Sequence, residues 1–127
     1  MEPSTTKPED RAKMVAGVRT LSLFYIGGAL LLLALSIPLL LGMVPPNGLY
    51  GFRVEKTMSD ATIWYAANKV LGADLLIASL VLLGTSVFLF TRRHVLTVLR
   101  VAMVGLAVTV LAVGAAIAHT AMAIGHM

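Results

Sequence analysis

The sequence predicts an all-α fold: an integral membrane bundle of three transmembrane helices, with an ordered outer loop between helices 1 and 2. Two observations carry this prediction. Of the 127 residues, 58% are hydrophobic and only 13% are charged, whereas about a quarter of the residues in a soluble domain are charged. Three stretches, residues 21–44, 70–90 and 101–118, contain a single charged side chain, Asp74. Since lipid offers no partners to backbone N–H and C=O groups, each stretch must be helical.

A single membrane domain over residues 1–127 is expected, with internal boundaries set by turn signals and charges. We expect a disordered cytoplasmic tail over residues 1–14, because it is polar and contains two prolines. Pro45-Pro46-Asn47-Gly48 is a stop and turn signal, and Thr57 followed by Asp60 resembles a helix N-cap with an acid in the first turn. The expected segments are helix 1 at about 15–43, the outer loop at 44–58, helix 2 at about 59–90 with an interfacial start, a cytoplasmic turn at 91–95 and helix 3 at about 96–123.

The basic residues predict how the chain is oriented in the bilayer. Seven Lys or Arg residues lie in the N-terminal tail or around the link between the second and third stretches, and three lie on the other side. Basic residues concentrate on the cytoplasmic side of membrane proteins. We therefore expect a cytoplasmic N-terminus and an outside C-terminus. Because this placement explains the net charge of +4, the lipid bilayer is an expected partner and nucleic acid is not.

The sequence offers no set of side chains suited to catalysis or metal binding. It contains no cysteine, which excludes disulfides and thiolate metal sites. His94 is expected on the cytoplasmic side and His119 and His126 near the other, so the three histidines do not form a metal site. No nucleophile–base pair or phosphate-binding glycine loop occurs. We expect a non-enzymatic protein with no catalytic residue, no metal and no cofactor.

The outer segment from Asn47 onward carries residue types that a plain membrane anchor does not need. Gly48 and Gly51 permit backbone conformations that branched residues resist, so residues 47–51 are expected to fold tightly onto the helix ends. Tyr50 can anchor this fold at the interface. Arg53 has a planar fork of five donors, and three roles stay open for it: contact with lipid phosphates or nearby carboxylates, an internal structural pair, and ligand binding.

Trp64, Asn68 and Gly72 recur every four residues, so a helix would place them along one narrow strip. The strip offers an aromatic ring, an amide and a gap for close backbone approach. It could clamp the Arg53 loop, with the Asn68 amide capping a loop carbonyl, or bind a ligand directly; we favour the clamp. Trp64 is also expected near the outer headgroup level, where amphipathic rings are favoured.

These motifs resemble the SdpI family of small bacterial membrane proteins. The resemblance covers about residues 45–72 and rests on Pro46-Asn47-x-x-Tyr50-Gly51-Phe52-Arg53, then Thr57 and Ser59, then Trp64-x-x-x-Asn68-x-x-x-Gly72. It implies a multi-pass protein of the bacterial inner membrane. The type member is an immunity and signalling protein against a secreted killing peptide, so the resemblance implies such a role. The motif residues are candidates for binding or structural support: Asn47, Tyr50, Gly51, Arg53, Thr57, Trp64, Asn68 and Gly72.

Asp74 is the most suggestive single residue, because a carboxylate inside a membrane costs about 2.5–3.5 kcal/mol. Counting from the expected cytoplasmic ends of helices 2 and 3 at about 1.5 Å per residue places Asp74 and His119 within about 3 Å in depth. We therefore expect an intramembrane polar pair between Asp74 and His119. Arg53 is the rival partner, and an Asp74 side chain that extends to outer water is the plainer alternative.

Two hypotheses of function follow. In the first, the protein recognises a membrane-active peptide or envelope component at the outer face, for immunity or signalling. In the second, it is a small accessory subunit packed in a larger membrane complex. Separately from both hypotheses, a homo-oligomer stays open. A stripe of small residues supports close helix packing in either case; its members are Gly105, Thr109, Ala112, Ala116, His119 and Ala123.

Overall fold

The computed structural model describes residues 6–127, and within that range the chain forms four helices and no strand. They are α1 (Pro8–Leu40), α2 (Glu55–Ser59), α3 (Ala61–Thr91) and α4 (Val98–Gly125). The three long helices are each long and apolar enough to cross a membrane. The predicted all-α fold with three transmembrane helices is confirmed.

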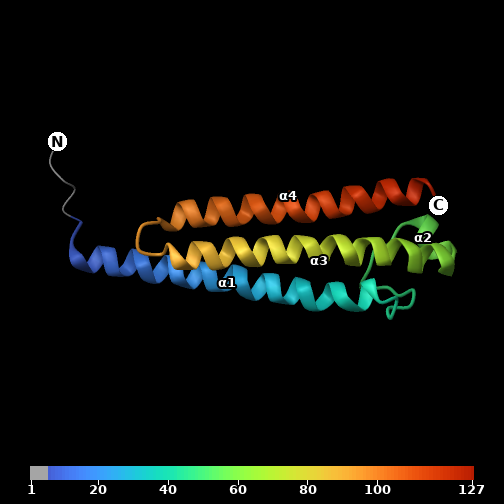
Figure 1. The fold of residues 1–127 in the computed structure, drawn as a ribbon, viewed down its shortest axis with the longest axis horizontal. Helices are drawn as coiled ribbons and strands as arrows, with labels where there is room; N and C mark the ends of the chain where they lie inside the picture. The colour runs from blue at the N-terminus through green and yellow to red at the C-terminus, as the bar shows by residue number, and fades with distance from the viewer. Residues whose placement is uncertain (1–5) are drawn as a thin grey trace.

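The long helices lie side by side, with α3 between α1 and α4 (Figure 1). The start of α1 and the turn between α3 and α4 lie at one end of the bundle. The loop after α1, the short helix α2 and the C-terminus lie at the other end. The segments that the charge count assigned to opposite faces of the membrane are thus at opposite ends. Which end faces the cytoplasm stays a prediction.

The first helix begins earlier than expected, at Pro8 rather than at about residue 15. Proline is favoured at the first helical position because its fixed φ suits the helix and its missing N–H is not needed there. Glu9 and Asp10 follow in the first turn, where carboxylates interact favourably with the positive end of the helix dipole. The prediction of a disordered tail is therefore wrong for residues 8–14, and its residues 1–5 lie outside the described range.

The end of α1 forms a tight reversal that starts the loop between α1 and α2. Met43 N–H donates to the Pro38 carbonyl (2.9 Å) and Gly42 N–H to the Leu39 carbonyl (3.1 Å). Gly42 adopts φ of 68°. These are the two hydrogen bonds and the left-handed residue of a Schellman motif, which satisfies the last carbonyls of a helix. The loop therefore leaves α1 in a defined direction.

The entrance to α3 differs from the prediction. Asp60, not Thr57, is the N-cap: its Oδ1 accepts hydrogen bonds from Thr62 N–H (2.8 Å) and Ile63 N–H (3.3 Å). Thr57 lies inside α2, a five-residue helix within the expected loop. The last helix spans Val98–Gly125, so it starts and ends two residues later than the expected 96–123; the Thr97 hydroxyl caps its start.

Small residues bring the helices together. Among the described residues, six buried residues with polar side chains lie in the three long helices, and four of them are serines. Apolar residues form one cluster at the loop end, around Leu39 and Trp64, and another at the opposite end, around Val18 and Val101. Because small side chains permit close helix approach in lipid, α1 and α3 pack tightly enough to support the loop end.

Candidate functional site

The cap, which we define as residues 44–60, is built around the side chain of Asn47. Its Oδ1 accepts hydrogen bonds from the backbone N–H groups of Leu49 and Tyr50, both at 2.8 Å. Its Nδ2 donates to the carbonyls of Pro45 (2.8 Å) and Tyr50 (3.0 Å). Asparagine side chains stabilise turns by such local bonds. Asn47 therefore uses its hydrogen-bonding capacity to shape the loop and has none left for a ligand.

Tyr50 and Gly51 fasten this turn to the helices. The Tyr50 hydroxyl donates to the Leu35 carbonyl of α1, and burial raises the pKa of the Tyr50 phenol. Gly51 adopts φ of 118°. A Cβ on Gly51 would lie 2.7 Å from Asn68 Oδ1 and 3.0 Å from the Trp64 ring. Only glycine satisfies both the backbone conformation and this close contact.

Trp64 and Asn68 form the clamp that the sequence predicts, although Asn68 differs from its expected detail. Trp64 is fully buried and its Nε1 donates to the Val44 carbonyl at 2.8 Å, so the ring packs inside the protein; its depth in the membrane stays a prediction. The Asn68 Oδ1 accepts from Phe52 N–H at 2.6 Å, while its Nδ2 donates to the Trp64 carbonyl at 2.9 Å. The amide therefore holds a loop N–H rather than a loop carbonyl.

At Gly72 the backbones of α1 and α3 come very close together. A Cβ at this site would lie 2.4 Å from Leu40 N and 2.9 Å from the Ser36 carbonyl oxygen. Both are backbone atoms, which cannot move away without separating the helices. The gap expected at the end of the Trp64 strip is present.

Helix α2, which lies within the cap, contacts the end of α4. Thr57 is fully buried; its hydroxyl donates to the Phe52 carbonyl (2.8 Å) and accepts from Val54 N–H (3.0 Å). Lys56 Nζ donates to the Ile124 carbonyl in the last turn of α4 at 2.8 Å. A cation at a helix C-terminus is favourable. This contact could not be predicted from the sequence, because it depends on where α4 ends.

Arg53 is the exception among the motif residues. Its side chain is exposed, and within residues 6–127 it makes no hydrogen bond or ion pair. It is therefore neither the partner of Asp74 nor part of an internal structural pair. Its five donors stay available to lipid phosphates or to a ligand.

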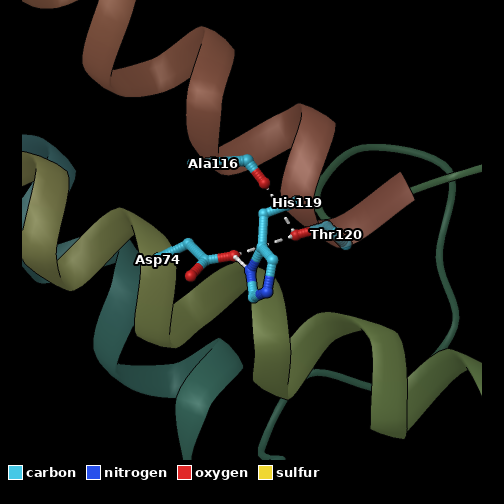
Figure 2. Close-up of polar contacts among 4 residues, drawn as sticks. All are labelled: Asp74, Ala116, His119 and Thr120. Carbon is cyan, nitrogen blue, oxygen red and sulfur yellow. Dashed lines mark hydrogen bonds and ion pairs between the residues drawn. The ribbon is translucent and has the colours of Figure 1, made fainter. Parts of the chain in front are cut away.

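Asp74 and His119 lie in contact across α3 and α4, as Figure 2 shows. His119 Nδ1 lies 2.7 Å from Asp74 Oδ2, and the Thr120 hydroxyl lies 3.5 Å from the same oxygen while donating to the Ala116 carbonyl at 2.9 Å. Asp74 retains 18% side-chain exposure, against 62% for His119. The pair expected from depth counting is thus present, and Thr120 is a neighbour that the sequence reasoning missed.

A groove runs from this pair along the seam between α3 and α4. It has a volume of about 550 Å³. Asp74 and His119 are its polar members, and the rest is apolar, with four alanines: Ala78, Ala112, Ala115 and Ala116. Asp74 Oδ1 makes no hydrogen bond with any residue in the described range. The groove therefore combines a small-residue floor with unused hydrogen-bonding capacity at one end.

The predicted small-residue stripe of α4 divides between packing and this groove. Gly105 packs against the Tyr25 ring, where a Cβ would lie 2.3 Å away, and the Tyr25 hydroxyl donates to the Ala102 carbonyl at 3.2 Å. Ala112 and His119 line the groove instead. Within the described residues, no group of three His, Cys, Asp or Glu side chains could hold a metal ion.

Comparison with known proteins identifies the family. A family model described as the SdpI/YfhL protein family matches residues 43–118. The uncharacterised protein YfhL of Bacillus subtilis (strain 168) is 30% identical over 74 residues, which make up 56% of this chain and 64% of that relative. The chain thus spans less than two thirds of the relative's length. No solved structure matches.

The family match extends well beyond the motifs of the loop. It includes the cap, all of α3 and most of α4, and it ends one residue before His119. It therefore covers more than half of the chain and both helices that form the groove. The chain belongs to the SdpI/YfhL protein family.

Proposed function

We propose that this protein recognises a membrane-active peptide at the loop end of the bundle, as an immunity or signalling protein without catalytic activity. The observation that carries the proposal is the groove between α3 and α4, with the Asp74–His119 pair at one end. Family membership supports the same role through the SdpI resemblance. Of the motif residues, only Arg53 is free to take part in recognition.

The shape and chemistry of the groove suit a short helical segment. Its lining extends from Asp74 to Val81 on α3 and from Val108 to His119 on α4, which corresponds to about two to three helical turns. The alanine floor permits close backbone approach by another helix. Asp74 Oδ1 and the exposed imidazole offer hydrogen-bonding partners to a polar or basic group on that helix. A purely apolar lipid tail would leave them unused.

The test is protection of sensitive cells against the killing peptide of the SdpI type system. Tryptophan at Ala112 or Ala115 would fill the groove, so we expect Ala112→Trp and Ala115→Trp to reduce protection about tenfold. Val110→Trp is the matched control, because Val110 is 60% exposed and does not line the groove. Membrane insertion of each variant is checked by fractionation. Full protection by inserted groove variants would contradict the proposal.

Arg53 is tested in the same assay. Arg53→Ala removes the free guanidinium, and Arg53→Lys retains the charge without the planar fork. We expect the alanine variant to lose protection and the lysine variant to retain part of it. Equal protection by wild type and Arg53→Ala would remove Arg53 from recognition.

The alternative is an accessory subunit, favoured by the same alanine floor because a helix of a larger complex could occupy the groove. Gentle detergent purification followed by native mass measurement separates the two. A reproducible stoichiometric protein partner, lost in Ala112→Trp but kept in Val110→Trp, supports the subunit. A lone monomer or homodimer argues against it.

A further inference from the structure

A second hollow lies at the opposite end of the bundle from the cap. It has a volume of about 570 Å³ and is lined by the first three turns of α1 and the turn after α3. Its basic members are Arg11, Arg19, Arg93 and His94, and its remaining members are small or apolar: Pro8, Ala12, Val15 and Ala16. Among residues 6–127, which the structure describes, no carboxylate lines it. The function proposed above makes no use of this site.

The three arginines are not neutralised by the protein itself. In the part of the chain that the structure describes, none of them forms a salt bridge. Glu9 and Asp10 lie on the first turn of α1 but do not line the hollow. Unpaired guanidiniums around a common hollow create a positive potential that attracts an anion.

One of the arginines is held in place. Arg93 Nη1 donates to the Phe90 carbonyl at 3.0 Å, and its guanidinium lies 4.6 Å from the centre of the Phe90 ring. These contacts use one of its five N–H donors and fix the side chain at the mouth of the hollow. Arg11 and Arg19, eight residues apart and so about 12 Å along the helix axis, face it from α1.

We propose that this basic hollow, defined by Arg11, Arg19, Arg93 and His94, binds the phosphate headgroup of an anionic phospholipid. Guanidinium groups match phosphate oxygens with paired hydrogen bonds. The small apolar residues of α1 leave room for the glycerol backbone beside the helix. Basic pockets between transmembrane helices bind anionic headgroups in this way. A basic juxtamembrane segment alone would attract such lipids to the surface without selecting particular arginines.

The experiment uses the full-length protein in detergent, titrated with phosphatidylglycerol or phosphatidylcholine and followed by native mass spectrometry. We expect retained phosphatidylglycerol adducts and much weaker retention of phosphatidylcholine. Neutralising the site in the triple variant Arg11→Gln, Arg19→Gln, Arg93→Gln should weaken phosphatidylglycerol binding about tenfold or more. No preference for the anionic lipid would overturn the proposal.

A matched triple variant separates the site from net charge. Lys13→Gln, Arg92→Gln and Arg100→Gln remove the same charge from the same end of the bundle, but none of these residues lines the hollow. We expect this control to change affinity less than about twofold. Equal weakening in both triple variants would show a diffuse surface attraction and overturn the site.

Two further measurements test the role of the guanidinium groups and the source of the phosphate. Changing the three site arginines to lysine retains charge and removes the planar fork, so binding should weaken while circular dichroism shows an intact helical fold. Inorganic phosphate at millimolar concentration tests the free anion as the source. Phosphate that displaces the lipid and binds with equal affinity would overturn the lipid assignment.

Discussion

The cap on α1 and α3 differs from the seam between α3 and α4 in how completely its polar groups are used. The Asn47 amide in the cap, and the Asn68 amide and Trp64 indole of α3 packed against it, all bond to backbone groups nearby. Along the seam, Asp74 keeps a free carboxylate oxygen and His119 is 62% exposed. The residues that make the sequence recognisable therefore mostly build the fold, and unused hydrogen-bonding capacity indicates where a partner can bind.

The largest effect on stability is expected at Gly72, where α1 and α3 are in close contact near the cap. Gly72→Ala places a methyl group 2.4 Å from the Leu40 backbone nitrogen, so α1 and α3 must separate. We expect a loss of about 3 kcal/mol in the free energy of unfolding, measured by denaturant titration in micelles. Gly84→Ala is the control, because in the described part of the chain its added Cβ meets no atom within 4 Å beyond its sequence neighbours and the adjacent backbone of its own helix, and its stability should change by less than about 1 kcal/mol. Similar stability of both variants would show that the helices do not touch there.

A smaller effect is expected within the loop itself. Gly51→Ala combines a positive φ with a 2.7 Å contact to Asn68 Oδ1, which should cost about 1–3 kcal/mol. Because Trp64 is the sole tryptophan of the chain, its fluorescence reports cap opening directly, and we expect a red-shifted emission. Gly48→Ala, with open space around its added Cβ, should leave the spectrum unchanged. An unshifted spectrum for Gly51→Ala would mean that the cap tolerates a side chain there.

The seam should give the smallest effect, because its polar pair is partly exposed. A double-mutant cycle with Asp74→Ala and His119→Ala should yield a coupling energy of about 0.6 kcal/mol, typical of hydrogen bonds between membrane helices. The measurement is the free energy of unfolding of wild type, both single variants and the double variant. A coupling of several kcal/mol would make the pair a structural element like the cap and would break the comparison.

The sequence sufficed to predict features that depend on periodicity and depth. Three helices, the close approach at Gly72 and the contact between Asp74 and His119 all follow from regular helical geometry. Each of these predictions comes from counting residues along a regular α-helix.

Features that depend on the irregular loop could not be predicted in detail. The burial of Trp64, the acceptor role of Asn68 and the isolation of Arg53 depend on how residues 44–60 fold back over α3. The position of α2 depends on competing caps, since both Thr57 and Asp60 can begin a helix. Only the three-dimensional path of the loop decides between them.

The hydrogen bond from Lys56 to the Ile124 carbonyl joins the two regions that otherwise behave differently. Lys56 lies in α2. The next residue, Thr57, donates a hydrogen bond to the Phe52 carbonyl, and the Phe52 N–H donates to the Asn68 side chain. A helix entering the groove and pushing α4 sideways by more than an ångström or so would stretch this bond beyond its normal length. Occupancy of the groove would then also displace α2 and the turn that carries Arg53, so the Lys56 ammonium group would couple the seam between α3 and α4 to the cap.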